Sequence, residues 1–132
     1  MRRNLNRFRV HDLVTVIVAP AETAALQWRG SCRIVFIDGA HDVLSVLGDF
    51  HQWLPHIRPG GFLLLHDSTA LSNFSGPQFV AREKMETSSR FDLTGTVGSI
   101  TWARVGGGDV SGVPHVCCAR TIDRLLALLK RK

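Results

Sequence analysis

Two short stretches contain residues that could do chemistry, "VFIDGAHD" at positions 35 to 42 and "LLLHD" at 63 to 67. Each is an apolar run that ends in an acid and a histidine: Asp38 with His41, and His66 with Asp67. Neighbouring strands of a parallel sheet lie about 5 Å apart, and about 10 Å apart if one strand intervenes. Carboxylates and imidazoles at such separations could hold a divalent cation or supply a general base.

Each of these residues also has a purely structural interpretation. Asp38 or Asp42 could cap a helix that starts near Val43. Asp67 with Ser68 could simply open a loop. Taken singly, each residue favours the structural role. Taken together, at the ends of two consecutive strands, they favour a site, because ligands bind outside the carboxyl ends of parallel strands.

The first half of the chain alternates apolar runs with helical patterns. The runs at 13 to 18, 33 to 37 and 62 to 65 predict buried strands. Helices are predicted after Pro20 and over residues 43 to 54, and "IRPGG" at 57 to 61 predicts a turn. Strand, helix and strand with continuous apolar strands indicate a right-handed crossover in a parallel sheet covered on both faces.

The second half has a different rhythm. A helix is predicted from about Pro77 to Ser88, followed by an antiparallel pair of strands with a tight turn around Gly95. We expect a partial α/β domain over residues 1–105, a glycine-rich linker over 106–120 and an amphipathic helix over 121–132.

Composition excludes several classes of protein. The 132 residues suit one domain, and 45% hydrophobic with 20% charged residues argue against wholesale disorder. Much of the net charge of +5 lies in the two ends, without a nucleic-acid-binding motif. The three cysteines do not suggest a disulfide framework or a zinc site. Without a secretory signal or a membrane span, we expect a cytoplasmic protein with no nucleic-acid partner and no membrane insertion.

The stretch from "RIVFIDGAHD" to "RPGGFLLLHD" resembles the second half of a class I S-adenosylmethionine-dependent methyltransferase. It is most similar to small-molecule O-methyltransferases, including macrocin-type and cephalosporin-hydroxylase-like proteins, whose fourth strand ends in IDGxH and whose fifth ends in HD. The resemblance covers roughly residues 10 to 105 and implies a truncated Rossmann-like sheet, parallel strands followed by a C-terminal antiparallel pair. It also implies O-methyl transfer to a small-molecule or sugar hydroxyl.

The same resemblance implies roles for individual residues. Asp38 and His41 would be catalytic, with His41 a candidate base toward the substrate hydroxyl. Asp38, His66 and Asp67 would be metal ligands, for Mg²⁺ in particular. S-adenosylmethionine would contact a set at the ends of two strands: Ala19, Ala21, Glu22, Asp38 and Gly39.

The family's glycine-rich cofactor loop has no counterpart here, since the chain contains no glycine before Gly30. The family sheet order, third-second-first-fourth-fifth-seventh-sixth, would lose its centre and leave the fourth strand as a bare edge, so we expect a homodimer through that edge. Three functions stay open. The chain is a methyltransferase whose cofactor site a dimer or partner completes, a catalytically incomplete binding or interaction module, or a fragment whose other half is encoded elsewhere.

Overall fold

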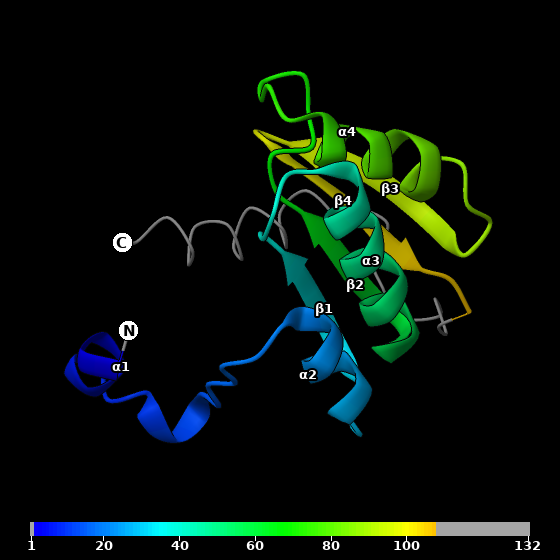
Figure 1. Cartoon of the computed structure of the whole chain (residues 1–132). Helices are drawn as coiled ribbons and strands as arrows, with labels where there is room; N and C mark the ends of the chain where they lie inside the picture. The colour runs from blue at the N-terminus through cyan, green and yellow to red at the C-terminus, as the bar shows by residue number, and fades with distance from the viewer. Residues whose placement is uncertain (1, 108–132) are drawn as a thin grey trace.

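The computed structural model describes residues 2–107, which form a four-stranded mixed sheet with helices packed on one face (Figure 1). The strands are β1 (Cys32–Ile37), β2 (Ile57–Leu65), β3 (Phe91–Val97) and β4 (Ile100–Val105). The α-helices are α1 (Arg2–Arg7), α2 (Ala21–Gln27), α3 (Val43–Trp53) and α4 (Ser75–Val80). Short helical turns occupy His11–Leu13, Leu54–His56 and Ala81–Met85, the last of them a π-helical turn that continues α4.

The sheet order is β1-β2-β4-β3, with β1 parallel to β2 and the other pairs antiparallel. This order corresponds to fourth-fifth-seventh-sixth, the part of the methyltransferase sheet expected from the sequence. The predicted parallel pair and the antiparallel end are therefore confirmed. The predicted linker and C-terminal helix lie beyond Gly107, outside the described residues, and the division of the chain into three parts stays a prediction.

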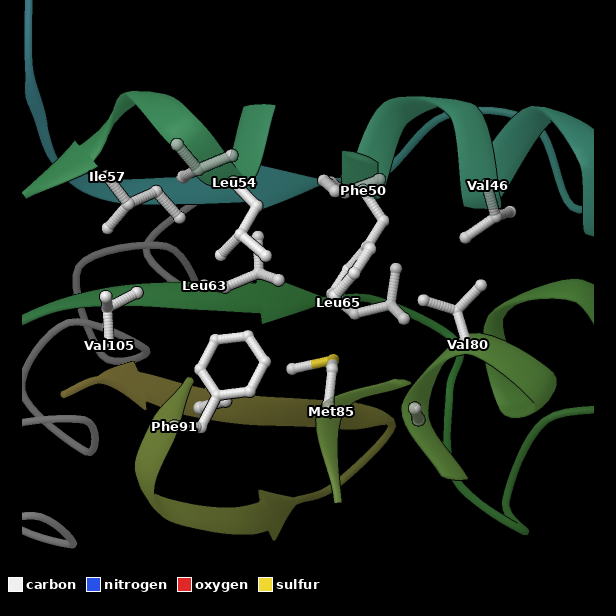
Figure 2. Packing of buried hydrophobic residues seen from close by; sticks show 14 residues of the cluster. Val46, Phe50, Leu54, Ile57, Leu63, Leu65, Val80, Met85, Phe91 and Val105 are labelled. Atoms are coloured by element: carbon white, nitrogen blue, oxygen red, sulfur yellow. The ribbon is translucent and has the colours of Figure 1, made fainter. Parts of the chain in front are cut away.

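The core lies between the sheet and α3 with α4. Val46, Phe50 and Leu54 point from α3 and its end toward Leu63 and Leu65 of β2 (Figure 2). The helix-side cluster is completed from the second half of the chain by Val80, Ala81, Met85, Phe91, Ala103 and Val105. α3 begins where Asp42 accepts a hydrogen bond from the Ser45 backbone N–H at 3.0 Å, so Asp42, and not Asp38, is the N-cap.

The expectation that the strands are covered on both faces is wrong for β1. Val35 and Ile37 are buried against the helices, whereas Ile34 and Phe36, on the other face, are each 40% exposed. Successive side chains of a strand point to opposite faces, so helices on one face bury only alternate residues.

The predicted strand at residues 13–18 is also wrong. Residues 14–18 have no regular structure, and the side chains of this segment are exposed. β-propensity measures the fit of a side chain to a pleated, half-buried surface. Among residues 2–107 no strand lies beside this segment to supply that surface.

Two predicted turns are displaced. Residues 57–61 belong to β2, although the register slips there, with Cys32 opposite Ile57 but Ile34 opposite Phe62. The hairpin turns at Gly98 and Ser99, not around Gly95, because Val97 pairs with Ile100. Gly98 has a positive φ of 59°, which a two-residue hairpin loop requires.

Candidate functional site

The four polar residues singled out from the sequence lie together at one end of the sheet. Ile37 of β1 pairs with Leu65 of β2, so both strands end at the same level. The His66 backbone N–H continues this ladder and donates to the Ile37 carbonyl at 3.0 Å. Parallel pairing in this register is what brings Asp38 and His66 side by side.

Asp67 is shared by two histidines. Its Oδ2 lies 3.1 Å from Nε2 of His41 and 3.3 Å from Nδ1 of His66. Asp38 Oδ1 lies 3.0 Å from the same Nδ1 of His66. The contacts to this buried nitrogen are ion-pair distances without hydrogen-bond geometry.

Sequence reasoning missed Ser99, the second residue of the hairpin turn. Its Oγ lies 3.1 Å from Nε2 of His66. The turn is held in place because the Ser68 backbone N–H donates to the Ser99 carbonyl at 2.9 Å and Thr69 Oγ1 donates to the Gly98 carbonyl at 2.9 Å. Nε2 of His66 thus has a hydrogen-bond partner in Ser99, whereas Nδ1 has only the ion-pair contacts to the two acids.

His41 differs from His66 in having a ring nitrogen available. Its ring stacks on Phe74 with centroids 3.9 Å apart and an interplanar angle of 30°. Nε2 contacts Asp67, and Nδ1 has no hydrogen-bond partner among residues 2–107. The loop carrying His41 is tied to α4, because Gly76 N–H donates to the His41 carbonyl at 3.2 Å. Phe74 is a further site residue that sequence reasoning missed.

A cavity of about 400 Å³ runs along β1 and ends at this site. Three of the predicted cofactor contacts line it, Ala21, Asp38 and Gly39. Glu22 instead lines a neighbouring hollow between α2 and α3. Ala19 is among the lining residues of neither.

Two acids near the cavity have shifted pKa values. Burial raises the pKa of Asp49, which lines the cavity from α3. The backbone N–H of Ser45, followed by its hydroxyl, lowers the pKa of Asp42 by hydrogen bonding to the charged carboxylate. The two acids are therefore expected to affect stability in opposite directions.

Replacing Asp49 with asparagine is expected to raise the melting temperature at neutral pH. The folded pKa of Asp49 lies above its ordinary value of 3.8, so stability falls as the pH rises through that interval. Below pH 3.8 both states are protonated and the gain should vanish. Circular dichroism melts across this pH range measure the effect.

Asp42→Ala is the matched control for Asp49→Asn. Because the pKa of Asp42 is lowered, its contribution is present above the ordinary value of 3.8 and is lost as the pH falls through the folded pKa. The control should therefore lower the melting temperature at neutral pH and lose its effect in acid. Destabilisation by Asp49→Asn at pH 7 would contradict the burial argument.

The predicted metal ligands pair with one another in this arrangement. Asp38 and Asp67 both contact Nδ1 of His66, at 3.0 and 3.3 Å. Within residues 2–107, no group of three or more His, Cys, Asp or Glu side chains is arranged to hold a metal ion. The metal role of Asp38, His66 and Asp67 therefore stays a prediction from the sequence.

Residues 1–68 match the protein family described as a methyltransferase domain. The match covers just over half of the 132 residues and includes both strand ends of the site. The chain belongs to this family. The resemblance expected from IDGxH and HD is thereby confirmed. No curated protein matches the chain.

Solved methyltransferases share the fold at low identity. The chain is 24% identical, with a TM-score of 0.61, to a protein of Klebsiella pneumoniae solved as a candidate O-methyltransferase. The alignment covers 80% of this chain and 56% of that one. An O-methyltransferase from Bacillus cereus in complex with S-adenosylhomocysteine (SAH) is 23% identical, with a TM-score of 0.58, over 78% of this chain and 56% of that chain. The chain thus spans little more than half the length of these relatives.

A third similar structure is the MycE methyltransferase from the mycinamycin biosynthetic pathway, in complex with Mg and SAH. It is 20% identical with a TM-score of 0.49 and covers 72% of this chain and 31% of that chain. No helix among residues 2–107 of this methyltransferase-family chain is long and apolar enough to cross a membrane.

Proposed function

We propose that this chain forms the acceptor side of an S-adenosylmethionine-dependent O-methyltransferase acting on a small-molecule or sugar hydroxyl. The observation that carries the proposal is the His41–Asp67 pair at the carboxyl ends of β1 and β2. Family membership supplies the reaction class, and the pair supplies a general base.

His41 accepts the proton of the acceptor hydroxyl at Nδ1. Asp67 accepts a hydrogen bond from Nε2–H of the same ring. This contact fixes the tautomer and stabilises the imidazolium that forms. Stacking on Phe74 holds the ring plane, so little motion is needed when the proton moves. S-adenosylmethionine, when bound, would supply the methyl group of its sulfonium to the acceptor oxygen and would leave as SAH.

His66 acts as a support for the two acids. With Nδ1 between Asp38 and Asp67 and Nε2 on Ser99, it holds the two acids in place and reduces their mutual repulsion. Asp38 stands 50% exposed at the cavity, where it can meet the cofactor or the acceptor. We propose no step through a metal ion, because the acids and imidazoles are paired with each other.

The cavity along β1 fits one end of the cofactor. Ala21 and Gly39 give it small walls, and Asp38 gives it an acceptor for hydroxyl or amino groups. Ala19 and Glu22 would have to contact the cofactor from the neighbouring loop and helix. A dimer or partner chain is proposed to complete the site, since the chain covers only 56% of each of these two relatives.

Isothermal calorimetry with S-adenosylmethionine and SAH tests the proposal. Asp38→Asn is expected to weaken binding by about tenfold or more, because a charged hydrogen-bond acceptor is lost (about 1.5–3 kcal/mol). Asp12→Asn, at an acid of the N-terminal segment whose side chain is 83% exposed, is the matched control and should bind as wild type. A parallel titration with Mg²⁺ tests the predicted metal ligands. Absence of heat with either cofactor form at millimolar concentration would contradict the proposal.

A second candidate function is binding without catalysis. One observation favours it: β1 is an edge strand of the described sheet, and its cavity is open along that edge. A measurement of methyl-transfer turnover distinguishes catalysis from binding alone. A chain that binds SAH but transfers no methyl group to any hydroxyl acceptor, alone or as a dimer, is a binding module.

A further inference from the structure

A separate hollow lies beside the candidate site, against the loop that follows β2. Its volume is about 490 Å³, which is within the usual range of ligand pockets (roughly 300–1,000 Å³). Its walls are loop residues 68–71, one side of α4 with its π-helical turn, and the β3–β4 hairpin at Thr96 and Gly98. We call it the α4 hollow. No described residue lines both this hollow and the cavity along β1, so a cofactor bound along β1 leaves it open.

The loop joins the α4 hollow to the proposed base. Asp67, which contacts His41, directly precedes Ser68 of the hollow wall, and the Cα atoms of consecutive residues are about 3.8 Å apart. Asp67 has a φ of 52°, a left-handed conformation that is uncommon outside glycine and that clusters at functional sites. Phe74, further along the same loop, stacks on the His41 ring. One acceptor molecule is therefore able to reach the base and the hollow together.

Gln78 of α4 fixes the loop that forms this wall. Its Nε2 donates to the Thr69 carbonyl at 3.0 Å and also to the Ser72 carbonyl. These two neighbours settle which end of the amide is the nitrogen, because a carbonyl oxygen only accepts. The amide oxygen has no hydrogen-bond partner among residues 2–107. Gln78 therefore holds the loop with one end of its amide and keeps an acceptor free in the wall of the hollow.

Three planar polar side chains line the helix wall at four-residue spacing, Gln78, Arg82 and Glu86. Residues four apart share one face of a helix. α4 widens into a π-helical turn here, where the Glu86 backbone N–H donates to the Ala81 carbonyl at 3.0 Å. Such turns inside helices are frequent at functional sites. Nε of Arg82 lies 3.4 Å from Oε1 of Glu83, an exposed pair that holds the guanidinium only weakly.

This row determines which ligand chemistry fits the hollow. Arg82 supplies only donors, Glu86 only acceptors, and the Thr96 hydroxyl supplies both. Among the described lining residues one positive and one negative side chain balance, so a ligand with a net charge gains no net attraction. None of these lining residues is aromatic, so a flat aromatic acceptor finds no ring to stack on. A neutral group with several hydroxyls, each both a donor and an acceptor, fits this set.

We propose that the α4 hollow binds a neutral polyhydroxylated part of the methyl acceptor, such as a sugar ring, beside the hydroxyl that His41 deprotonates. Gln78, Arg82 and Glu86 select the acceptor by hydrogen bonding, since an analogue without these hydroxyls leaves their polar groups unpaired. The inference rests on the proposed function for the ligand's role as acceptor, whereas binding in the hollow requires no methyl transfer.

Backbone amide chemical shifts of the full chain, titrated with methyl glucoside, methyl galactoside and myo-inositol, test this site. Shifts are expected at residues 68–71, 78–86 and 96–98. Arg82→Ala and Glu86→Gln should each weaken binding of the tightest probe by about tenfold or more, because a charged hydrogen-bonding group is lost. Arg58→Ala is the matched control, since Arg58 is exposed near the start of β2, at the end of the sheet opposite the hollow. It should bind the probe as wild type does.

A parallel titration with S-adenosylmethionine separates this inference from the proposed function. No shift at the hollow with any of the three probes at hundreds of millimolar overturns the inference, and cofactor binding in the same sample would leave the proposed function standing. Probe binding in the hollow without cofactor binding supports the site but contradicts the proposed function and the acceptor role with it. Equal affinity of wild type, Arg82→Ala and Glu86→Gln for the probe, or tighter binding of catechol than of all three probes, also overturns the inference.

Discussion

Replacing His41 with glutamine is expected to lower the rate of methyl transfer by about 100- to 10,000-fold, the usual contribution of a general base. Glutamine can still donate a hydrogen bond from its amide N–H to Asp67 but cannot take up the proton of the acceptor hydroxyl. The loss should therefore appear in kcat, while the dissociation constant of S-adenosylmethionine changes little. Release of S-adenosylhomocysteine in single-turnover reactions measures the effect.

His51→Gln is the matched control for His41→Gln. His51 lies on α3 with its side chain exposed, and its ring packs against Phe50 with centroids 5.5 Å apart, so its replacement should leave the rate unchanged. Asp67→Asn should give a smaller loss than His41→Gln, because the base is kept but its tautomer is no longer fixed. Equal rates for wild type and His41→Gln would show that another group removes the proton from the acceptor hydroxyl.

The parallel pair and the place of the site could be predicted from the sequence because both depend on local patterns, whereas the order of the sheet was implied by the resemblance to the family. An apolar run that ends in an acid marks the carboxyl end of a strand, and two such runs joined by one helix must end side by side. The pairing of Ile37 with Leu65 confirms this for Asp38 and His66. The prediction required only the single crossover between the two strands and no contact between more distant parts of the chain.

Ser99 and Phe74 could not be predicted because their contacts join distant parts of the chain. Ser99 reaches His66 from 33 positions away, across a hairpin whose turn was predicted at a different glycine. Gly95 and Gly98 give the same turn signal in the sequence. In the structure Gly95 lies within β3, with the Trp102 ring so close that a Cβ there would lie 2.6 Å from it. Packing of that ring requires glycine in the strand.

The segment 13–18 shows the limit of strand propensity. Its residues favour an extended chain, but a strand forms only where another strand supplies hydrogen bonds and a surface to bury side chains. The sequence therefore identified the segment's preference for an extended conformation. Because no neighbouring strand lies beside it among residues 2–107, it forms no strand there. The same reasoning explains why β1 is buried on one face only.

Leu63→Ala is expected to lower the free energy of unfolding by about 2–5 kcal/mol, the usual cost of a large-to-small change in a core. Leu63 is 0% exposed, toward the carboxyl end of β2, and lies among Phe50, Leu54 and Phe91 (Figure 2). Urea unfolding followed by circular dichroism measures the loss. Leu44→Ala, at a leucine that is 81% exposed on α3, should change the stability by less than about 0.5 kcal/mol.

The same variant tests whether the core positions the site. β2 carries His66 and Asp67 directly after Leu65, so a cavity under Leu63 loosens the strand that aligns Asp67 with His41. If the alignment depends on β2, methyl transfer in Leu63→Ala should fall under conditions where the variant is still folded, because a misplacement of about 1 Å can cost about 100-fold in rate. An unchanged rate in the folded variant would show that the hydrogen bond between His66 N–H and the Ile37 carbonyl holds the strand end without help from the core.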